Sequence, residues 1–202
     1  MTFSGRKGKF LKPLSSIDAV QFDMNKIKQL VNRDIDGLIG TQIISDYNLM
    51  IDYDHNKVVF ISDRSDLKVF DPSAYIISKA PIVINDGKSF IQMNIAGHKL
   101  NMLMDSGANI SVLDQKWSKR LRVQQNLTSQ MQDDFIIQQS SVNNVSISNL
   151  GITYRNLEGF QNESNYDGIL SLSSLNADKV IFDYKRNQVI FFWKTEDFAS
   201  LD

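Results

Sequence analysis

Apolar and polar residues alternate in short runs along most of the chain. This period-two pattern, and the richness of the runs in Val, Ile, Phe and Tyr, are typical of β-strands. Helical periodicity is weaker and is confined to residues 24–31 and 114–121. The pattern therefore predicts a mostly β fold with one or two short helices. The predicted strands cover residues 57–61, 82–85, 90–95, 100–104, 135–139, 145–147, 152–157, 180–184 and 189–193.

Turn-forming residues separate several of these runs. Residues 85–87 read Asn-Asp-Gly, a strong hairpin signal because these residues tolerate a positive φ. Residues 96–98 and 149–151 are weaker signals of the same kind. The polar stretch 62–79, which contains Pro72, is expected to connect two parts of the chain.

The chain contains an internal repeat. Residues 35–61 align without a gap with residues 166–192, at an offset of 131 positions. In each copy Asp-Gly and two aliphatic residues precede a short helix-like span, a strand, a turn and a second strand. We interpret this as a duplicated supersecondary unit related by a pseudo-two-fold axis. The identical pairs are Asp36/Asp167, Gly37/Gly168, Asp52/Asp183, Tyr53/Tyr184, Asn56/Asn187, Val58/Val189 and Phe60/Phe191.

The two copies have unequal surroundings. Residues 80–165, rich in predicted strands, precede the second copy, whereas only residues 1–34 precede the first. We therefore expect a partial first lobe and one complete lobe. The expected division is a basic arm at 1–16, the partial lobe at 17–61, a linker at 62–79, the complete lobe at 80–193 and a tail at 194–202. No apolar segment follows the basic arm, so it is interpreted as a solvated or partner-binding arm and not as a signal peptide.

The composition of the chain excludes several kinds of functional site and of partner. The 202 residues are 42% hydrophobic with a formal net charge of -1, which gives no reason to expect nucleic acid or a membrane surface as partner. The absence of cysteine excludes a Cys nucleophile, disulfides and Cys-held metals. With only His55 and His98, a His-rich metal site is excluded as well. No run reaches the roughly 18–20 apolar residues that span a bilayer, so the chain is expected in the cytoplasm, or outside it if an N-terminal segment was removed.

One segment carries a chemical signature. Residues 100–113 read LNMLMDSGANISVL, in which an apolar strand delivers Asp105 into a turn of Ser106, Gly107 and Ala108 before a second apolar stretch. Asp-Ser-Gly can be a simple turn, because Asp caps backbone N–H groups and Gly adopts positive φ. Turn-forming Asp usually lies between polar residues, however, and here strands flank both sides.

In this context the sequence resembles the aspartic peptidase superfamily of retropepsin-like and pepsin-like double-psi barrels, above all the bacterial retropepsin-like proteins. Residues 103–108 match the family's apolar strand ending in Asp-Thr/Ser-Gly-Ala, here a DSGA motif. Residues 38–40, and Ile169 with Leu170, match its later signature of two aliphatics and a Gly, with Ser171 in place of that Gly in the second copy. The resemblance implies an acid-protease-type closed barrel at 80–193 plus a partial N-terminal lobe.

The resemblance also implies a set of site residues. Asp105 would be the catalytic carboxylate, on a loop supported by Ser106, Gly107 and Ala108. A substrate-covering flap would lie within residues 127–139, although an ordinary surface hairpin is an equal alternative there. The implied flap and cleft residues are Met131, Asp133, Asp134 and Phe135, and the implied psi-loop residues are Gly40, Ile169, Leu170 and Ser171.

The family's chemistry needs two carboxylates that hold one water and share one proton, and it needs no metal or organic cofactor. This chain has one Asp-Ser-Gly loop. Either two chains pair their Asp105 loops in a homodimer, or a missing lobe supplies the second Asp, or the domain no longer cleaves. The expected function is an aspartic endopeptidase acting on a peptide or protein substrate. The alternatives are a non-catalytic module that binds a peptide or protein partner, and a purely structural β domain.

Overall fold

The computed structural model describes residues 23–25, 28–29, 34–37, 39–61, 72–121, 124–125, 134–158 and 165–195. Strands dominate this part of the chain and form one mixed sheet of fourteen strands, which confirms the predicted mostly β class. The helical elements are single turns. They are α2 (Thr41–Ile44) and the 3-10 turns η2 (Pro72–Ala74), η3 (Gln115–Trp117), η4 (Leu172–Leu175) and η5 (Tyr184–Arg186).

An antiparallel meander opens the large lobe, made of β3 (Tyr75–Asn85), β4 (Lys88–Ile95) and β5 (His98–Asp105). Both connections are two-residue turns with positive φ at both positions, +49° and +68° at residues 86–87 and +48° and +84° at residues 96–97. This geometry matches the right-handed twist of hairpin strands, so both predicted turns are confirmed. β3 starts at Tyr75, earlier than the predicted strand and inside the expected linker.

The later strands of this part of the chain insert between the earlier ones. β12 (Gly168–Ser171) runs parallel to β5 and antiparallel to β6 (Ser111–Asp114), so it lies between the two strands that flank the Asp-Ser-Gly loop. β6 is also parallel to β11 (Leu150–Arg155). The remaining strands of this part of the chain are β7 (Gln124–Gln125), β8 (Asp134–Ile137), β9 (Ser140–Val142) and β10 (Val145–Ile147).

The repeat copies each end in a hairpin. The first is β1 (Asn48–Asp52) with β2 (Lys57–Ile61), and the second is β13 (Lys179–Asp183) with β14 (Gln188–Lys194). In both turns the same Asn takes the left-handed conformation, Asn56 at φ +52° and Asn187 at φ +50°. The pairing registers of the two hairpins coincide once 131 is added to the first.

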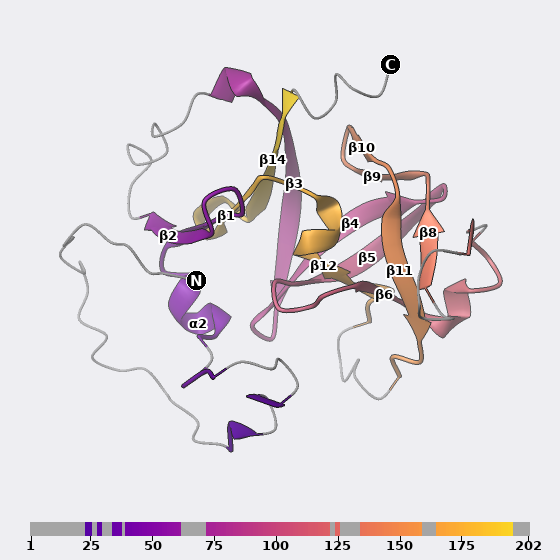
Figure 1. Ribbon diagram of the computed structural model, residues 1–202, viewed down its shortest axis with the longest axis horizontal. Coiled ribbons are helices and arrows are strands. Elements are labelled where there is room, and N and C mark those ends of the chain that lie inside the picture. The colour runs from indigo at the N-terminus through magenta and orange to yellow at the C-terminus, as the bar shows by residue number, and fades with distance from the viewer. Residues whose placement is uncertain are drawn as a thin grey trace.

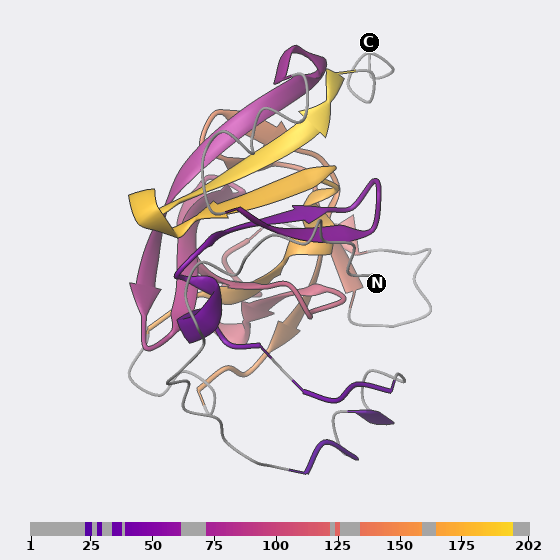
Figure 2. The same cartoon turned by 90° about the vertical axis from the view of Figure 1, so that its left-hand side faces the viewer.

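The two hairpins meet edge to edge. β1 pairs antiparallel with β13, and Met50 lies opposite Ile181, its own equivalent in the repeat. Leu49 lies opposite Phe182 and Ile51 opposite Val180, so the pairing is symmetric about the Met50–Ile181 pair. Figure 2 shows the β1–β2 hairpin beside the yellow strands β13 and β14.

The sheet path runs β2-β1-β13-β14-β3-β4-β5-β12-β6-β11-β8-β7, with β9 and β10 attached to β4. Its two ends, β2 and β7, do not pair with each other, so the sheet of the described residues is open and the expected closed barrel is not confirmed. In Figure 1, β1, β2 and α2 lie on one side of β3 and β14, and β4, β5, β6, β8 and β11 lie on the other.

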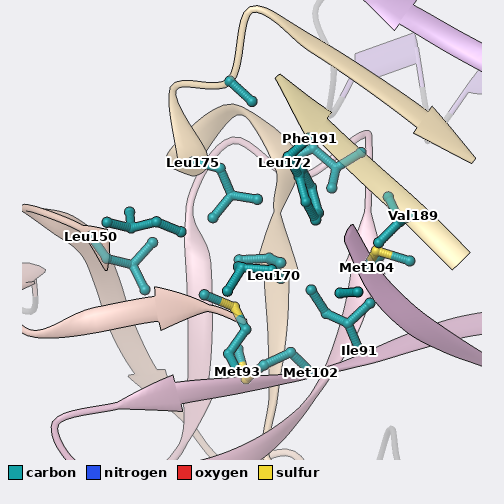
Figure 3. Packing of buried hydrophobic residues seen from close by; sticks show 14 of the residues in the cluster. Ile91, Met93, Met102, Met104, Leu150, Leu170, Leu172, Leu175, Val189 and Phe191 are labelled. Atoms are coloured by element: carbon teal, nitrogen blue, oxygen red, sulfur yellow. The ribbon is translucent and has the colours of Figure 1, made fainter. Parts of the chain in front are cut away.

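One hydrophobic cluster joins the lobe to the first repeat copy. Leu170 and Phe191 are fully buried in this cluster. Figure 3 shows Leu170 next to Met93 of β4 and Met102 of β5. Leu49 and Ile51 of β1 belong to the same cluster. The β1–β2 hairpin of the first copy is therefore anchored through β1 to the core of the second copy.

The helix predictions fare less well. The helix predicted at 114–121 is wrong, because only the 3-10 turn η3 forms there, capped by the Asp114 carboxylate, which accepts a hydrogen bond from the Lys116 N–H at 2.9 Å. Most of the helix predicted at 24–31 lies outside the described residues. Among the described residues, no helix combines the length and the apolar character needed to cross a bilayer.

Candidate active site

Asp105 is the last residue of β5, and its side chain is exposed. The chain turns immediately, and the Gly107 N–H donates a 2.8 Å hydrogen bond to Asp105 Oδ1. A Cβ at Gly107 would lie 3.3 Å from that oxygen, so glycine permits this close approach. No other hydrogen bond to the Asp105 carboxylate occurs within the described residues, which leaves Oδ2 available to a water molecule.

β12 fastens the far side of the loop. Ser171 lies opposite Asp105 in the parallel pairing, and its hydroxyl donates a 2.6 Å hydrogen bond to the Ala108 carbonyl. The Ser171 N–H donates to Ser111 Oγ at 3.1 Å. Ser171 and Ser111 are completely buried. Ser171 therefore holds the Asp105 loop in place, and sequence reasoning missed Ser111 altogether.

The entry of β12 between its neighbours depends on Gly168. A Cβ at this position would lie 2.4 Å from the Val112 carbonyl oxygen and 2.7 Å from the Met102 side chain. No side chain larger than hydrogen fits there without a shift of the backbone. Of the expected psi-loop residues, Ile169, Leu170 and Ser171 thus lie together in β12, next to Asp105.

Gly40, the remaining expected psi-loop residue, lies elsewhere. It is exposed at the start of α2 in the first copy, and apart from its chain neighbours no atom of the described residues lies within 4 Å of an added Cβ. The structure therefore does not bring Gly40 to the Asp105 loop.

Asp167 holds the start of β12 in place next to the Asp105 loop, a role that the sequence did not predict. Its carboxylate accepts hydrogen bonds from the Asn101 N–H at 3.0 Å and from Trp117 Nε1 at 3.1 Å, and it pairs with Lys116 Nζ at 3.1 Å. These contacts tie the start of β12 to β5 and to η3. The signal available in the sequence was the identity of Asp167 with Asp36 across the repeat.

The expected flap is described only at its base. β7 and β8 pair antiparallel, with Gln125 opposite Phe135, as the two arms of a hairpin would. Met131 and Asp133 lie outside the described residues, and Asp134 begins β8. Phe135 is half-buried with its ring edge-on to Tyr154 at 5.1 Å, and none of its described contacts involves the Asp105 loop.

A cavity of about 180 Å³ lies between the loop and the first repeat copy. Ser106 of the candidate loop forms part of its wall. Residues of the first copy and of β13 also line it, so the loop adjoins the first repeat copy. The lining residues are Thr41, Leu49, Ile51, Gly87, Lys88, Ser89, Leu103, Met104, Ser106, Phe182 and Tyr184.

Charged side chains line the β1–β13 seam. The buried Lys179 ammonium lies 3.0 Å from Asp52 Oδ1 and 3.5 Å from Asp54 Oδ2, and Lys194 lies 2.9 Å from Asp54. Burial alone would raise the pKa of Asp52, but the hydrogen bonds from Lys179 and His55 outweigh it and hold that pKa below its usual value.

Asp52, Asp54 and His55 are also the one group of three potential metal ligands among the described residues. Because two lysines already neutralise the two carboxylates, we interpret this group as an ion-pair network and not as a metal site.

No protein-family model matches the sequence, and the comparison with curated proteins gives no match either. Among solved structures, the chain is similar to a retropepsin-like aspartic protease from Rickettsia conorii, with 16% identity and a TM-score of 0.42 over 59% of this chain and 93% of that one.

It is also similar to conglutin gamma from lupine seeds (13% identity, TM-score 0.43, 76% of this chain and 53% of that one). A third similar structure is the basic 7S globulin from soybean (12% identity, TM-score 0.40, 73% and 52%). The chain spans about half the length of these two seed globulins. At these identities and TM-scores the similarity says nothing about activity, which has to be inferred from the site itself.

Proposed function

We propose that this chain contributes one half of an aspartic-peptidase-type active site, with Asp105 as one of two carboxylates that activate a water for peptide hydrolysis. The observation that carries the proposal is an exposed carboxylate on a loop fastened on both sides. The Gly107 N–H holds Asp105 Oδ1 at 2.8 Å, and the Ser171 hydroxyl holds the Ala108 carbonyl at 2.6 Å. A carboxylate presented in this way is positioned in advance and remains accessible.

The reaction needs a second carboxylate about 3 Å away, so that the two share one proton. The ionised member takes a proton from the water, and the water oxygen then bonds to the scissile carbonyl carbon. The protonated member donates a hydrogen bond to the carbonyl oxygen. Proton transfer to the amide nitrogen then allows the C–N bond to break, releasing a carboxylic acid and an amine. The titration belongs to the pair and not to either aspartate.

We propose that the second carboxylate comes from another lobe that carries its own Asp-Ser/Thr-Gly loop, because this sequence contains one. The homodimer expected from the sequence stays a prediction. The pairing of β13 weighs against a homodimer in which a second copy would pair with this strand. β13 is hydrogen-bonded on both sides, to β1 and to β14, so a second copy cannot add to β13 without displacing β1.

A two-lobed chain tests the proposal. Because Tyr166 is the repeat equivalent of Ile35, a copy of residues 75–165 placed directly before Ile35 supplies the first copy with the strands and the Asp loop that precede the second. We expect this two-lobed chain to cleave a peptide mixture, as measured by mass spectrometry of the products. The cleavage rate should have a bell-shaped pH dependence set by the aspartate pair.

The matched controls are Asp105→Asn and the same change in the added loop. Each should lower the cleavage rate at least about a hundredfold, because loss of one carboxylate removes either the base or the acid. A folded two-lobed chain whose cleavage does not depend on Asp105 would contradict the proposal. Peptide binding without cleavage would favour the second candidate, a peptide-binding module, which the single Asp-Ser-Gly loop in the sequence also supports.

A further inference from the structure

The outer edge of β2 lacks the partner that its repeat equivalent has. β14, the equivalent of β2, is paired with β13 on one side and with β3 on the other, from Gln188 opposite Pro81 to Lys194 opposite Tyr75. Among the described strands, β2 pairs only with β1. An unpaired strand edge is a ready template for another strand.

The same asymmetry is visible in the side chains. Phe60 and Phe191 are identical positions of the repeat, in strands of the same register, yet Phe60 is 36% exposed and Phe191 is fully buried. Likewise Ile39 is 55% exposed, whereas its equivalent Leu170 is fully buried. Large apolar side chains are thus exposed in the first copy at positions that the second copy buries.

Two equivalent glycines, Gly168 and Gly37, differ in their surroundings in the same way. Gly168 is crowded by β5 and β6, so it has no room for a Cβ, whereas around Gly37 no atom of the described residues, chain neighbours aside, lies within 4 Å of an added Cβ. Neither glycine has a positive φ, so backbone conformation does not require glycine at position 37. Glycine costs conformational entropy on folding, and a close neighbour of the β5–β6 kind would explain its presence.

We propose that residues 35–61 are the docking surface for a second lobe built like residues 75–165. The first strand of that lobe pairs antiparallel with β2, and its two Asp-loop strands enclose residues 36–40. This inference rests on the proposed function, since the docked lobe is the source of the second carboxylate. Addition of a strand to an exposed edge is a common mode of recognition, with main-chain hydrogen bonds giving affinity.

A second folded copy of this chain does not fit the surface. Its β3 is already paired with β14 and β4, and its β5 and β6 already hold their own β12. The occupant is therefore a lobe whose equivalent strands are free. The cavity beside Ser106, bounded by Thr41, Leu49 and Ile51, is where such a lobe would come closest to the Asp105 loop.

Disulfide trapping tests the pairing with a defined probe, because the chain contains no cysteine. The probe is a synthetic peptide with the sequence of β3, YIISKAPIVIN, which pairs with β14 in this fold. Transfer of the β14–β3 register to β2 places Val59 opposite peptide position Lys79, since Ile190 lies opposite Lys79, and places Phe60 opposite Ser78. The proteins are Val59→Cys and Phe60→Cys, and the peptides carry Lys79→Cys or Ser78→Cys.

We expect each protein to trap its in-register peptide about tenfold more than the peptide shifted by one residue, because such a shift turns the side chain to the other face of the sheet. Opposed residues of antiparallel strands have Cα atoms roughly 4.5–5.5 Å apart, within the range that a disulfide bridges. The control is Met50→Cys on β1, which is bonded on both sides by β2 and β13 and should trap neither peptide.

Three results would overturn the inference. One is the absence of trapping, and another is trapping with no preference for register. The third is protein–protein disulfides through Cys at 59 or 60 in place of peptide adducts, because a second copy would then occupy the edge. The readout does not involve hydrolysis. In-register trapping together with an inactive two-lobed chain would reject the proposed function alone, and an active two-lobed chain without trapping would reject the docking surface alone.

Discussion

The two repeat copies fold alike in their second halves and differ in their first. The β1–β2 and β13–β14 hairpins share their register and their left-handed Asn. In contrast, residues 168–171 form the buried strand β12, whereas the described residues among their equivalents, Gly37, Ile39 and Gly40, lie in no strand and Ile39 is exposed. The local sequences are similar in both halves, so the difference arises from the surroundings.

This difference distinguishes structure that a segment forms within its own residues from structure that depends on strands elsewhere in the chain. A hairpin satisfies most of its backbone hydrogen bonds within its own residues. The Asp-Gly-aliphatic segment becomes a strand only where β5 and β6 supply partners on both sides. Among the described residues, the second copy has those strands beside it and the first copy does not. Three pairs of substitutions at equivalent positions test this explanation, and a fourth pair tests the seam that joins the copies.

Truncation of the aliphatic side chain should give the largest difference. Leu170→Ala removes a fully buried side chain from the main core and should lower the free energy of unfolding by about 2–5 kcal/mol. Ile39→Ala should change it by less than about 0.5 kcal/mol, since Ile39 is 55% exposed. Urea denaturation measures both. In the two-lobed chain the Ile39 change should become as costly as the Leu170 change, and equal costs in the original chain would refute the comparison.

The equivalent glycines should differ next. Gly168→Ala places a Cβ 2.4 Å from the Val112 carbonyl oxygen, which should cost about 1–3 kcal/mol of stability. The added Cβ of Gly37→Ala meets no atom of the described residues within 4 Å, chain neighbours aside, so this change should be neutral, or stabilising by up to about 1 kcal/mol. Thermal denaturation of the two variants gives the comparison. A destabilising Gly37→Ala would show that the segment is already packed in the chain by itself.

Exchange of the residues at the end of the segment should have a smaller effect. Ser171→Gly removes the hydrogen bonds to Ala108 and Ser173 and should cost about 1 kcal/mol. The reciprocal change, Gly40→Ser, alters an exposed position and should leave stability within about 0.5 kcal/mol. Hydrogen exchange of the 106–110 amides reports on the loop, and protection unchanged in Ser171→Gly would mean that the serine does not anchor it.

The seam that joins the copies should show the smallest effect, as a pH dependence. The pKa of Asp52 is held below its usual value of 3.8, because Lys179 and His55 outweigh the effect of burial. At pH values between the lowered pKa of Asp52 in the folded chain and 3.8, the folded chain binds fewer protons than the unfolded chain. The stabilisation is therefore present above pH 3.8 and is lost as pH falls through the folded pKa.

Asp52→Asn should therefore flatten the acid side of the curve of unfolding free energy against pH, and Lys179→Met should reduce its slope. Denaturant titrations from neutral pH to about pH 3 measure this. An unchanged acid limb in Asp52→Asn would show that another carboxylate controls it.

Much of the fold could be predicted from the sequence because it depends on short-range signals. The strand predicted at 57–61 has the bounds of β2, and the turns at 85–87 and 96–98 form with the expected positive φ. The helix at 114–121 could not be predicted correctly, because a short, weakly periodic segment lacks the length that stabilises an α-helix. Nothing local indicated that the sheet would remain open at β2 and β7.

The site was predictable in part. Asp105 and its glycine were identifiable because an Asp-Ser-Gly turn between two apolar strands is a local pattern. Ser171 was marked by its position, but its hydrogen bond to the Ala108 carbonyl joins residues 63 positions apart. Asp167 was marked by the repeat, but its contacts with Asn101 and Trp117 depend on how β5 and η3 pack.

The sequence by itself determined the class of fold, the repeat and the loop that presents Asp105, because alternation, glycine and asparagine act within a few residues of themselves. Only the tertiary structure decided which Asp-Gly segment becomes a strand, which serine anchors the loop and which edge of β13 is taken by β1. Those outcomes depend on hydrogen bonds and packing between residues far apart in the chain. The same segment is therefore buried where such partners exist and exposed where they do not.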